Sequence, residues 1–104
     1  MLFRSIAFGG LQYLLPKELN TFFRTCCEEG CEIITSQPMH SELSPYKLLK
    51  SVPRGKMSWS HPYIYSAKIA GYEIKRVNTG FMSTSHEAQM VFAHFIPKSS
   101  YEKN

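Results

Sequence analysis

The second half of the chain carries side chains whose types suit contact with a nucleic acid. Cationic groups bind phosphates and aromatic rings stack on unpaired bases, so RNA contact requires a mixture of the two. The set comprises Arg54, Lys56, Lys68, Lys75, Arg76 and Lys98, interleaved with Tyr63, Tyr65, Tyr72 and Tyr101. The plainer interpretation is that these lysine and tyrosine side chains simply cover a half-exposed sheet.

The net charge of +4 is unevenly distributed along the chain. Residues 1–43 carry three cations and five anions, whereas residues 44–104 carry nine cations and three anions. A basic half of this kind is typical of a protein that meets a polyanion or an acidic partner. An ordinary solvated basic face would give the same composition.

The cysteines and glycines do not form a pattern that would bind a metal or a cofactor. Cys26, Cys27 and Cys31 are a poor disulfide framework, because their number is odd and two are adjacent. We expect reduced thiols, with the first two packed in the core. The cysteine spacing does not match a zinc site, and Gly9-Gly10 is not a dinucleotide-binding fingerprint. We therefore expect neither a metal nor a cofactor.

The first half of the chain predicts two strands and two helices. Leu2–Phe8 is an apolar strand candidate that ends at a glycine pair. The clearest helix is Pro16–Glu29, where an apolar stripe of helical period follows a proline suited to the first helical position. Cys31–Thr35 predicts a short strand, with the start of a second helix as the alternative. Residues 36–41 predict a loop, and residues 44–51 predict a short helix.

Residues 63–77 predict a β-hairpin that presents several of the cations. Polar and apolar side chains alternate in Tyr63–Ile69 and again in Tyr72–Val77, with a tight-turn signal at Ala70-Gly71. Asn78–Gly80 predicts the next turn. The basic loop at residues 54–56 would lie just before this hairpin.

The segment that follows has two interpretations. Thr84 and Glu87 match a capping box, which would open a helix from Ser85 to about Phe95. Against this, Gln89–Ile96 is rich in Val, Phe and Ile and ends at a proline. Both faces of such a strand are apolar, which suits a central, buried strand. We favour the strand.

These elements predict a single α+β domain over residues 1–104. The helical N-terminal half would pack on a small antiparallel sheet formed mainly by the C-terminal half. No run of ~18 apolar residues occurs, so no membrane span is expected. Reduced cysteines favour a cytoplasmic location.

The C-terminal part of the chain, residues 63–103, resembles the RelE/ParE superfamily of toxin–antitoxin ribonucleases. The resemblance lies in the motif Y-x-Y-x-A-K-I-x-G-Y-E-I-K-R-V and in the ending MVFAHFIPKSSYEK. It implies metal-independent cleavage of RNA, free or on the ribosome, by attack of a ribose 2′-OH on the adjacent phosphate. It also implies a small acidic antitoxin as the partner.

The same resemblance implies roles for individual residues. Lys68, Arg76 and Lys98 would neutralise the charge of the phosphorane, and His94 or Tyr101 would transfer the proton. The mixture of cations and aromatic rings, independently of the resemblance, predicts the residues that would contact RNA, which are Arg54, Lys56, Lys75, Tyr65 and Tyr72. His94 lies in an apolar run, so an ordinary core histidine remains the alternative for that residue.

Two other functions remain open. Arg54-Gly55 and the later G-F-M-S-T-S segment, residues 80–85, resemble elements of arginine-type ADP-ribosyltransferases, but no downstream glutamate motif follows. The main alternative to a ribonuclease is a non-enzymatic basic module, as in a phage or mobile-element protein, that docks an acidic protein or a nucleic acid.

Overall fold

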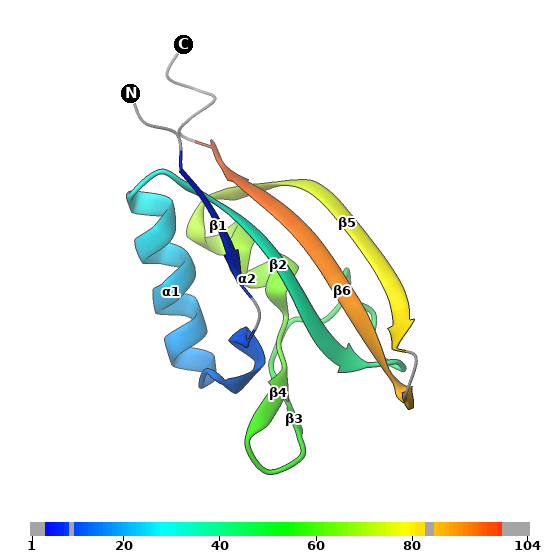
Figure 1. Ribbon diagram of the computed structural model, residues 1–104. Coiled ribbons are helices and arrows are strands. Elements are labelled where there is room, and N and C mark those ends of the chain that lie inside the picture. The colour runs from blue at the N-terminus through cyan, green and yellow to red at the C-terminus, as the bar shows by residue number, and fades with distance from the viewer. Residues whose placement is uncertain (1–3, 9, 83–84, 99–104) are drawn as a thin grey trace.

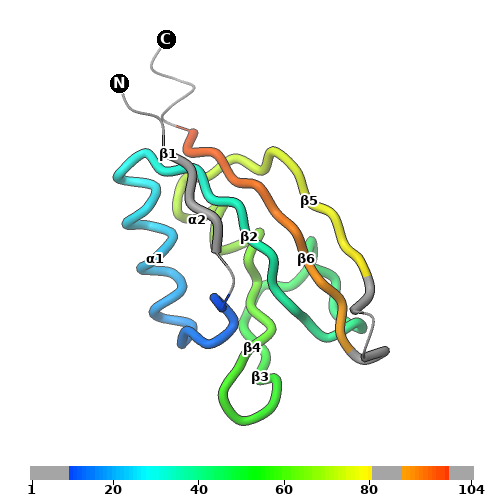
Figure 2. Tube along the Cα trace, in the orientation of Figure 1, coloured from blue at the N-terminus to red at the C-terminus, as the bar shows by residue number. Residues whose placement is uncertain are grey.

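The computed structural model describes residues 4–8, 10–82 and 85–98 (Figures 1 and 2). These residues form an α+β fold, the class that the sequence predicts. Its elements are β1 (Arg4–Phe8), η1 (Leu11–Tyr13), α1 (Pro16–Glu28), β2 (Cys31–His40), β3 (Val52–Arg54), β4 (Ser58–Ser60), α2 (Tyr63–Ala70), β5 (Tyr72–Met82) and β6 (Ser85–Pro97). Within these ranges no helix is both long enough and apolar enough to cross a membrane.

Four of the strands form one sheet in the order β1-β2-β6-β5. β1 and β2 are parallel and are joined through α1, while β6 pairs antiparallel with both β2 and β5. β3 and β4 form a separate hairpin, which projects from one end of the molecule (Figure 1). Both α-helices pack on one face of the sheet, and neither covers the opposite face (Figure 1).

Helix α1 forms as its sequence predicts. Pro16 occupies its first turn, and the backbone N–H of Leu15 donates a hydrogen bond to Glu18 Oε1 at 2.9 Å. Leu19 and Phe23, one turn apart, are fully buried against the sheet. Gly30 follows the helix with a positive φ of 76°, so it ends the helix in the left-handed conformation that glycine favours.

The core of the domain is built around three aromatic rings. Phe23 of α1 packs edge-on against Tyr72 and Phe95, with ring centroids 6.1 Å and 5.6 Å away. The Tyr72 hydroxyl donates a hydrogen bond to the Cys31 carbonyl at 2.7 Å, which satisfies its buried polar atom. α1, β2, β5 and β6 are thereby held together by a single cluster.

The predicted hairpin of residues 63–77 is wrong in its first half, because Tyr63–Ala70 is helix α2. Its residues Tyr63, Ile64 and Ala67 fall on one helical face and are buried. Gly71 ends the helix with φ 110° instead of making a hairpin turn. The second predicted strand, Tyr72–Val77, is confirmed, and it continues to Met82 through the predicted turn at Asn78–Gly80.

Two further predictions, a loop at residues 36–41 and a helix at residues 44–51, are wrong. β2 runs on to His40 through the predicted loop at residues 36–41. Pro38 is tolerated there because the paired residues of β1 and β2 end at Phe8 and Thr35, so the β1–β2 ladder needs no donor from residue 38. The predicted helix of residues 44–51 stops after one turn, in which the Ser44 carbonyl accepts from Lys47 and Leu48.

The strand interpretation of Gln89–Ile96 is confirmed, and the helix that would begin at Ser85 is wrong. β6 lies between β2 and β5, so its backbone groups are paired on both sides. Val91 and Phe95 point into the core, but Phe92 on the other face is 47% exposed. The strand is therefore central, as predicted, but buried on one face only.

The division of the chain into a helical half and a sheet half is looser than predicted. β1 and β2 bring the first half of the chain into the sheet, and α2 belongs to the second half. The sheet is mostly antiparallel, with one parallel pair at its β1 edge.

Candidate functional site

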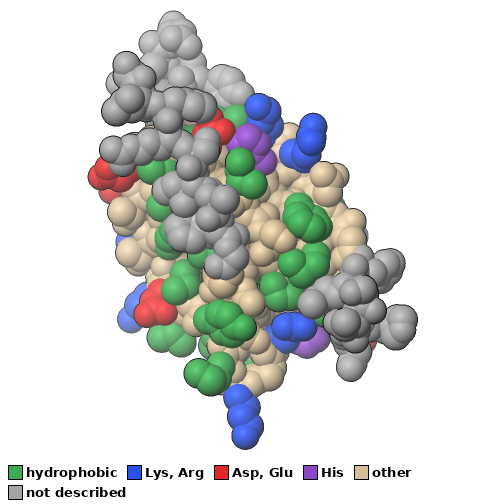
Figure 3. Space-filling view, in the orientation of Figure 1, with side chains coloured by type: hydrophobic (Ala, Val, Ile, Leu, Met, Phe, Trp, Pro, Cys, Tyr) green, Lys and Arg blue, Asp and Glu red, His purple; other side chains and the backbone are tan. Residues whose placement is uncertain are grey.

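The candidate site is the face of the sheet opposite the helices, which we call the open face. The strand register aligns outward residues of β2, β6 and β5 in rows across the sheet, since directly paired residues share a face. The rows are Ile34–His94–Arg76, Ser36–Phe92–Asn78 and Pro38–Met90–Gly80. Figure 3 shows apolar side chains gathered on this face, with a histidine and cationic groups toward its upper edge.

A β-bulge in β5 places two cations at the end of this face. The register shifts between Ile74 and Arg76, so Lys75 is an extra residue and Arg76 is the one that pairs with His94. With regular pairing, Lys75 would oppose His94 and Arg76 would point into the core. Both side chains are instead exposed.

His94 is held by a carboxylate from the neighbouring strand. Its Nε2 lies 2.7 Å from Glu32 Oε1, and the two side chains are 23% and 9% exposed. A carboxylate accepts hydrogen bonds, so Nε2 carries a proton and Nδ1 is the acceptor nitrogen of the neutral ring. Arg76 is the strand partner of His94, so a proton-transfer group, a carboxylate and a cationic residue lie on the same face of the sheet.

Two predicted catalytic lysines lie near the start of β5. The backbone N–H of Lys98 donates to the Gly71 carbonyl at 2.9 Å, and that of Gly71 donates to the Lys68 carbonyl at 3.1 Å. Both lysine side chains are exposed, but Lys68 belongs to α2, on the helix side of the sheet. Tyr101, the remaining predicted catalytic residue, lies outside the described residues.

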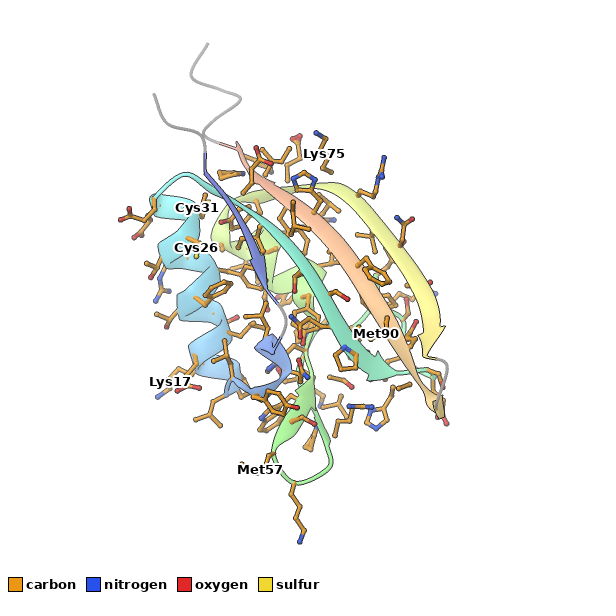
Figure 4. The ribbon with its side chains drawn as sticks, viewed as in Figure 1. Lys17, Cys26, Cys31, Met57, Lys75 and Met90 are labelled. Atoms are coloured by element: carbon orange, nitrogen blue, oxygen red, sulfur yellow. The ribbon has the colours of Figure 1, made fainter. Side chains whose placement is uncertain are left out.

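The predicted RNA-contacting residues do not share one surface. Arg54 and Lys56 belong to the β3–β4 hairpin, whereas Lys75 lies at the opposite end of the molecule, as the labels of Met57 and Lys75 indicate in Figure 4. Tyr65 is 41% exposed but on α2. Tyr72 is fully buried with its hydroxyl bonded, so its predicted contact with a base is wrong. Of the predicted set, Lys75, Arg76 and His94 come together on the open face.

The cysteines contribute no reactive thiol to this face. All three are free, Cys31 is buried, and Cys26 and Cys27 are half-buried against the core cluster. Burial raises the pKa of the Cys26 and Cys27 thiols, which keeps both protonated and poorly nucleophilic near neutral pH. Among the described side chains, no three metal-binding groups converge on one point.

Sequence reasoning missed two members of the site. Glu32 reaches His94 from a strand 62 positions away in the chain, and no local pattern predicts that pairing. Phe92 had a usable signal, since it alternates with His94 in the predicted strand and therefore shares its face. The elements of the ADP-ribosyltransferase resemblance lie apart, with Arg54 in the two-stranded sheet and Gly80 in the four-stranded one.

Comparison with known proteins assigns neither a family nor a function to this chain. No protein-family model, no curated protein and no solved structure matches this chain.

Proposed function

We propose that the protein is a small metal-independent endoribonuclease that binds single-stranded RNA on the open face of its sheet. The observation that carries the proposal is the 2.7 Å contact between His94 and Glu32, in the row that ends at Arg76. Proton transfer and charge neutralisation are the two needs of RNA cleavage by an internal nucleophile.

The chemistry assigns a separate task to each group. His94 Nδ1 accepts the proton of the ribose 2′-OH as its oxygen attacks the adjacent phosphate. Glu32 holds the imidazole in the required tautomer and stabilises the imidazolium that forms. Arg76 neutralises the charge that develops on the phosphorane. A proton must then reach the departing 5′-oxygen, a role that the resemblance implies for Tyr101.

The neighbouring row offers a place for a base. Phe92 is 47% exposed and lies two residues before His94 on the same strand face, a separation of ~7 Å. An unstacked base can lie on this ring while the next phosphate approaches His94 and Arg76. Lys75 and Lys98 add positive charge at the same end of the sheet, which favours the phosphate backbone.

A cleavage assay with single-stranded RNA oligonucleotides in the presence of EDTA tests the proposal. We expect products that end in a 2′,3′-cyclic phosphate, and loss of cleavage in His94→Ala and Arg76→Ala. Lys56→Ala is the matched control, because it removes a cation from the distant hairpin and should leave cleavage unchanged. Absence of cleavage by the wild-type protein, or full activity of His94→Ala, would refute the ribonuclease.

The exposed apolar residues of the same face favour a second candidate, a non-enzymatic binding module. Ile34 is 43% exposed beside Phe92, and Pro38 and Met90 are half-buried. Such a surface with cations at its end fits a small acidic protein, and in a toxin–antitoxin pair that partner would cover the RNA site. Tight RNA or protein binding without cleavage would favour this candidate. In both proposals the protein acts in the cytoplasm.

A further inference from the structure

A hollow lies on the helix side of the molecule, away from the open face of the sheet. It has a volume of about 390 Å³ and lies between α1, α2 and residues 49–51. The residues that line it include Asn20, Arg24, Leu49, Ser51, Tyr65 and Ile69. A volume of this size accommodates a small organic ligand.

Ser51 in the wall of this hollow is bonded to a buried histidine. The distance from Ser51 Oγ to His61 Nδ1 is 2.7 Å, and His61 Nε2 lies 2.8 Å from the Leu14 carbonyl oxygen. A carbonyl can only accept, so Nε2 carries the proton and Nδ1 accepts from the Ser51 hydroxyl. The hydroxyl is thus directed at a base whose orientation is set by a third group.

The surroundings of His61 keep its imidazole in the basic form. The ring is fully buried, stacks on Trp59 and meets the edge of Tyr63. Burial lowers the pKa of His61 and is only partly opposed by the bond to Leu14. Tyr63 is itself titratable, but burial raises its pKa further, so it stays uncharged.

We propose that Ser51 and His61 form a catalytic dyad that hydrolyses small carboxylic esters in this hollow. The dyad has the nucleophile, base and orienting group of serine hydrolases, with a main-chain carbonyl in the place of the usual carboxylate. The inference is independent of the ribonuclease proposal, because it uses neither His94 nor the open face.

The reaction balances with water as the only co-reactant. Ser51 Oγ attacks the ester carbonyl carbon while its proton passes to His61 Nδ1. The bond to the leaving alcohol breaks, and His61 returns the proton to that oxygen. Water then attacks the acyl-serine, gives a proton to His61, and the acid leaves as Ser51 recovers its proton.

The lining selects the class of ester. Leu49 and Ile69 supply apolar surface for a short acyl chain, and both are more than half exposed toward the hollow and solvent. Asn20 and Arg24 belong to the same lining, and their amide and guanidinium groups are donors of the kind that stabilises the oxyanion of a tetrahedral intermediate. A short-chain acyl ester fits this combination.

A fluorophosphonate probe tests the dyad in the full-length protein. We expect one covalent adduct, located on Ser51 by mass spectrometry, and hydrolysis of p-nitrophenyl butyrate that Ser51→Ala reduces to the buffer rate. Arg24→Ala should lower kcat by about 10²-fold. Ser44→Ala, in the same loop but outside the lining, is the matched control and should behave as wild type.

The labelling experiment needs no variant, so it decides the matter even if Ser51→Ala folds poorly. No adduct on Ser51, or ester hydrolysis that survives intact in a folded Ser51→Ala protein, would overturn the proposal. Either result would leave the Ser51–His61 bond as a purely structural contact.

Discussion

Replacing Gly71 with alanine tests how helix α2 ends against α1. Gly71 has a φ of 110°, a conformation that costs an L-residue about 1–2 kcal/mol. An added Cβ would also lie 3.1 Å from Cys27 Sγ, which is closer than ordinary contact and adds about 1 kcal/mol. We therefore expect Gly71→Ala to lower the free energy of unfolding by about 2–3 kcal/mol.

The chain provides a matched control for the conformational part of this cost. Gly30 also follows a helix and has a φ of 76°, but a Cβ there would meet no atom within 4 Å. Gly30→Ala should therefore cost only about 1–2 kcal/mol. Urea unfolding followed by the fluorescence of the single tryptophan, Trp59, measures both variants on one scale.

A double-mutant cycle with Cys27→Ala isolates the steric part. Without Sγ, the methyl group of Gly71→Ala has room, so the double variant should be about 1 kcal/mol more stable than the sum of the two single changes implies. Equal costs for Gly71→Ala and Gly30→Ala, together with no coupling to Cys27, would refute the proposed close contact between α1 and the end of α2.

Three further outcomes follow from the described contacts. Tyr72→Phe should destabilise the protein by about 1–2 kcal/mol in urea unfolding, because the buried Cys31 carbonyl loses its donor; a neutral change would contradict that bond. Because burial lowers the pKa of His61 in the folded state, the unfolded state binds more protons, so the free energy of unfolding should fall as pH drops below about 6.5. His61→Gln should remove this part of the pH dependence. Phe92→Ala should weaken binding of single-stranded RNA by about 1–3 kcal/mol in fluorescence anisotropy, whereas Tyr13→Ala, an exposed ring in η1, should not.

Local sequence signals predict an element correctly where short-range preferences and long-range packing favour the same structure. Pro16 and a stripe of helical period predict α1, because both act within a few residues. The β-branched and aromatic run of β6 outweighs the capping box near its start, since a central strand gains partners on both sides.

Residues 63–70 lie where local reasoning fails. Their alternation fits a strand, but Tyr63, Ala67 and the turn at Gly71 also fit a helix with one buried face. Packing of α2 against α1, a segment distant in the sequence, decides between the helical period and the strand period. The length of β2 is decided in the same way, because its pairing with β6 continues through Pro38.

Residue types and short-range patterns are enough to predict an α+β class, a basic second half and a histidine in a β-prone run. Which of these groups lie close together depends on how the chain folds. Pairing of β2 with β6 brings Glu32 to His94, and the bulge at Lys75 turns Arg76 outward instead of into the core. The same packing buries Tyr72 and leaves Arg54 and Lys56 at the far end. Strand register and burial depend on contacts across the whole chain, whereas residue types and short-range periodicity can be read locally.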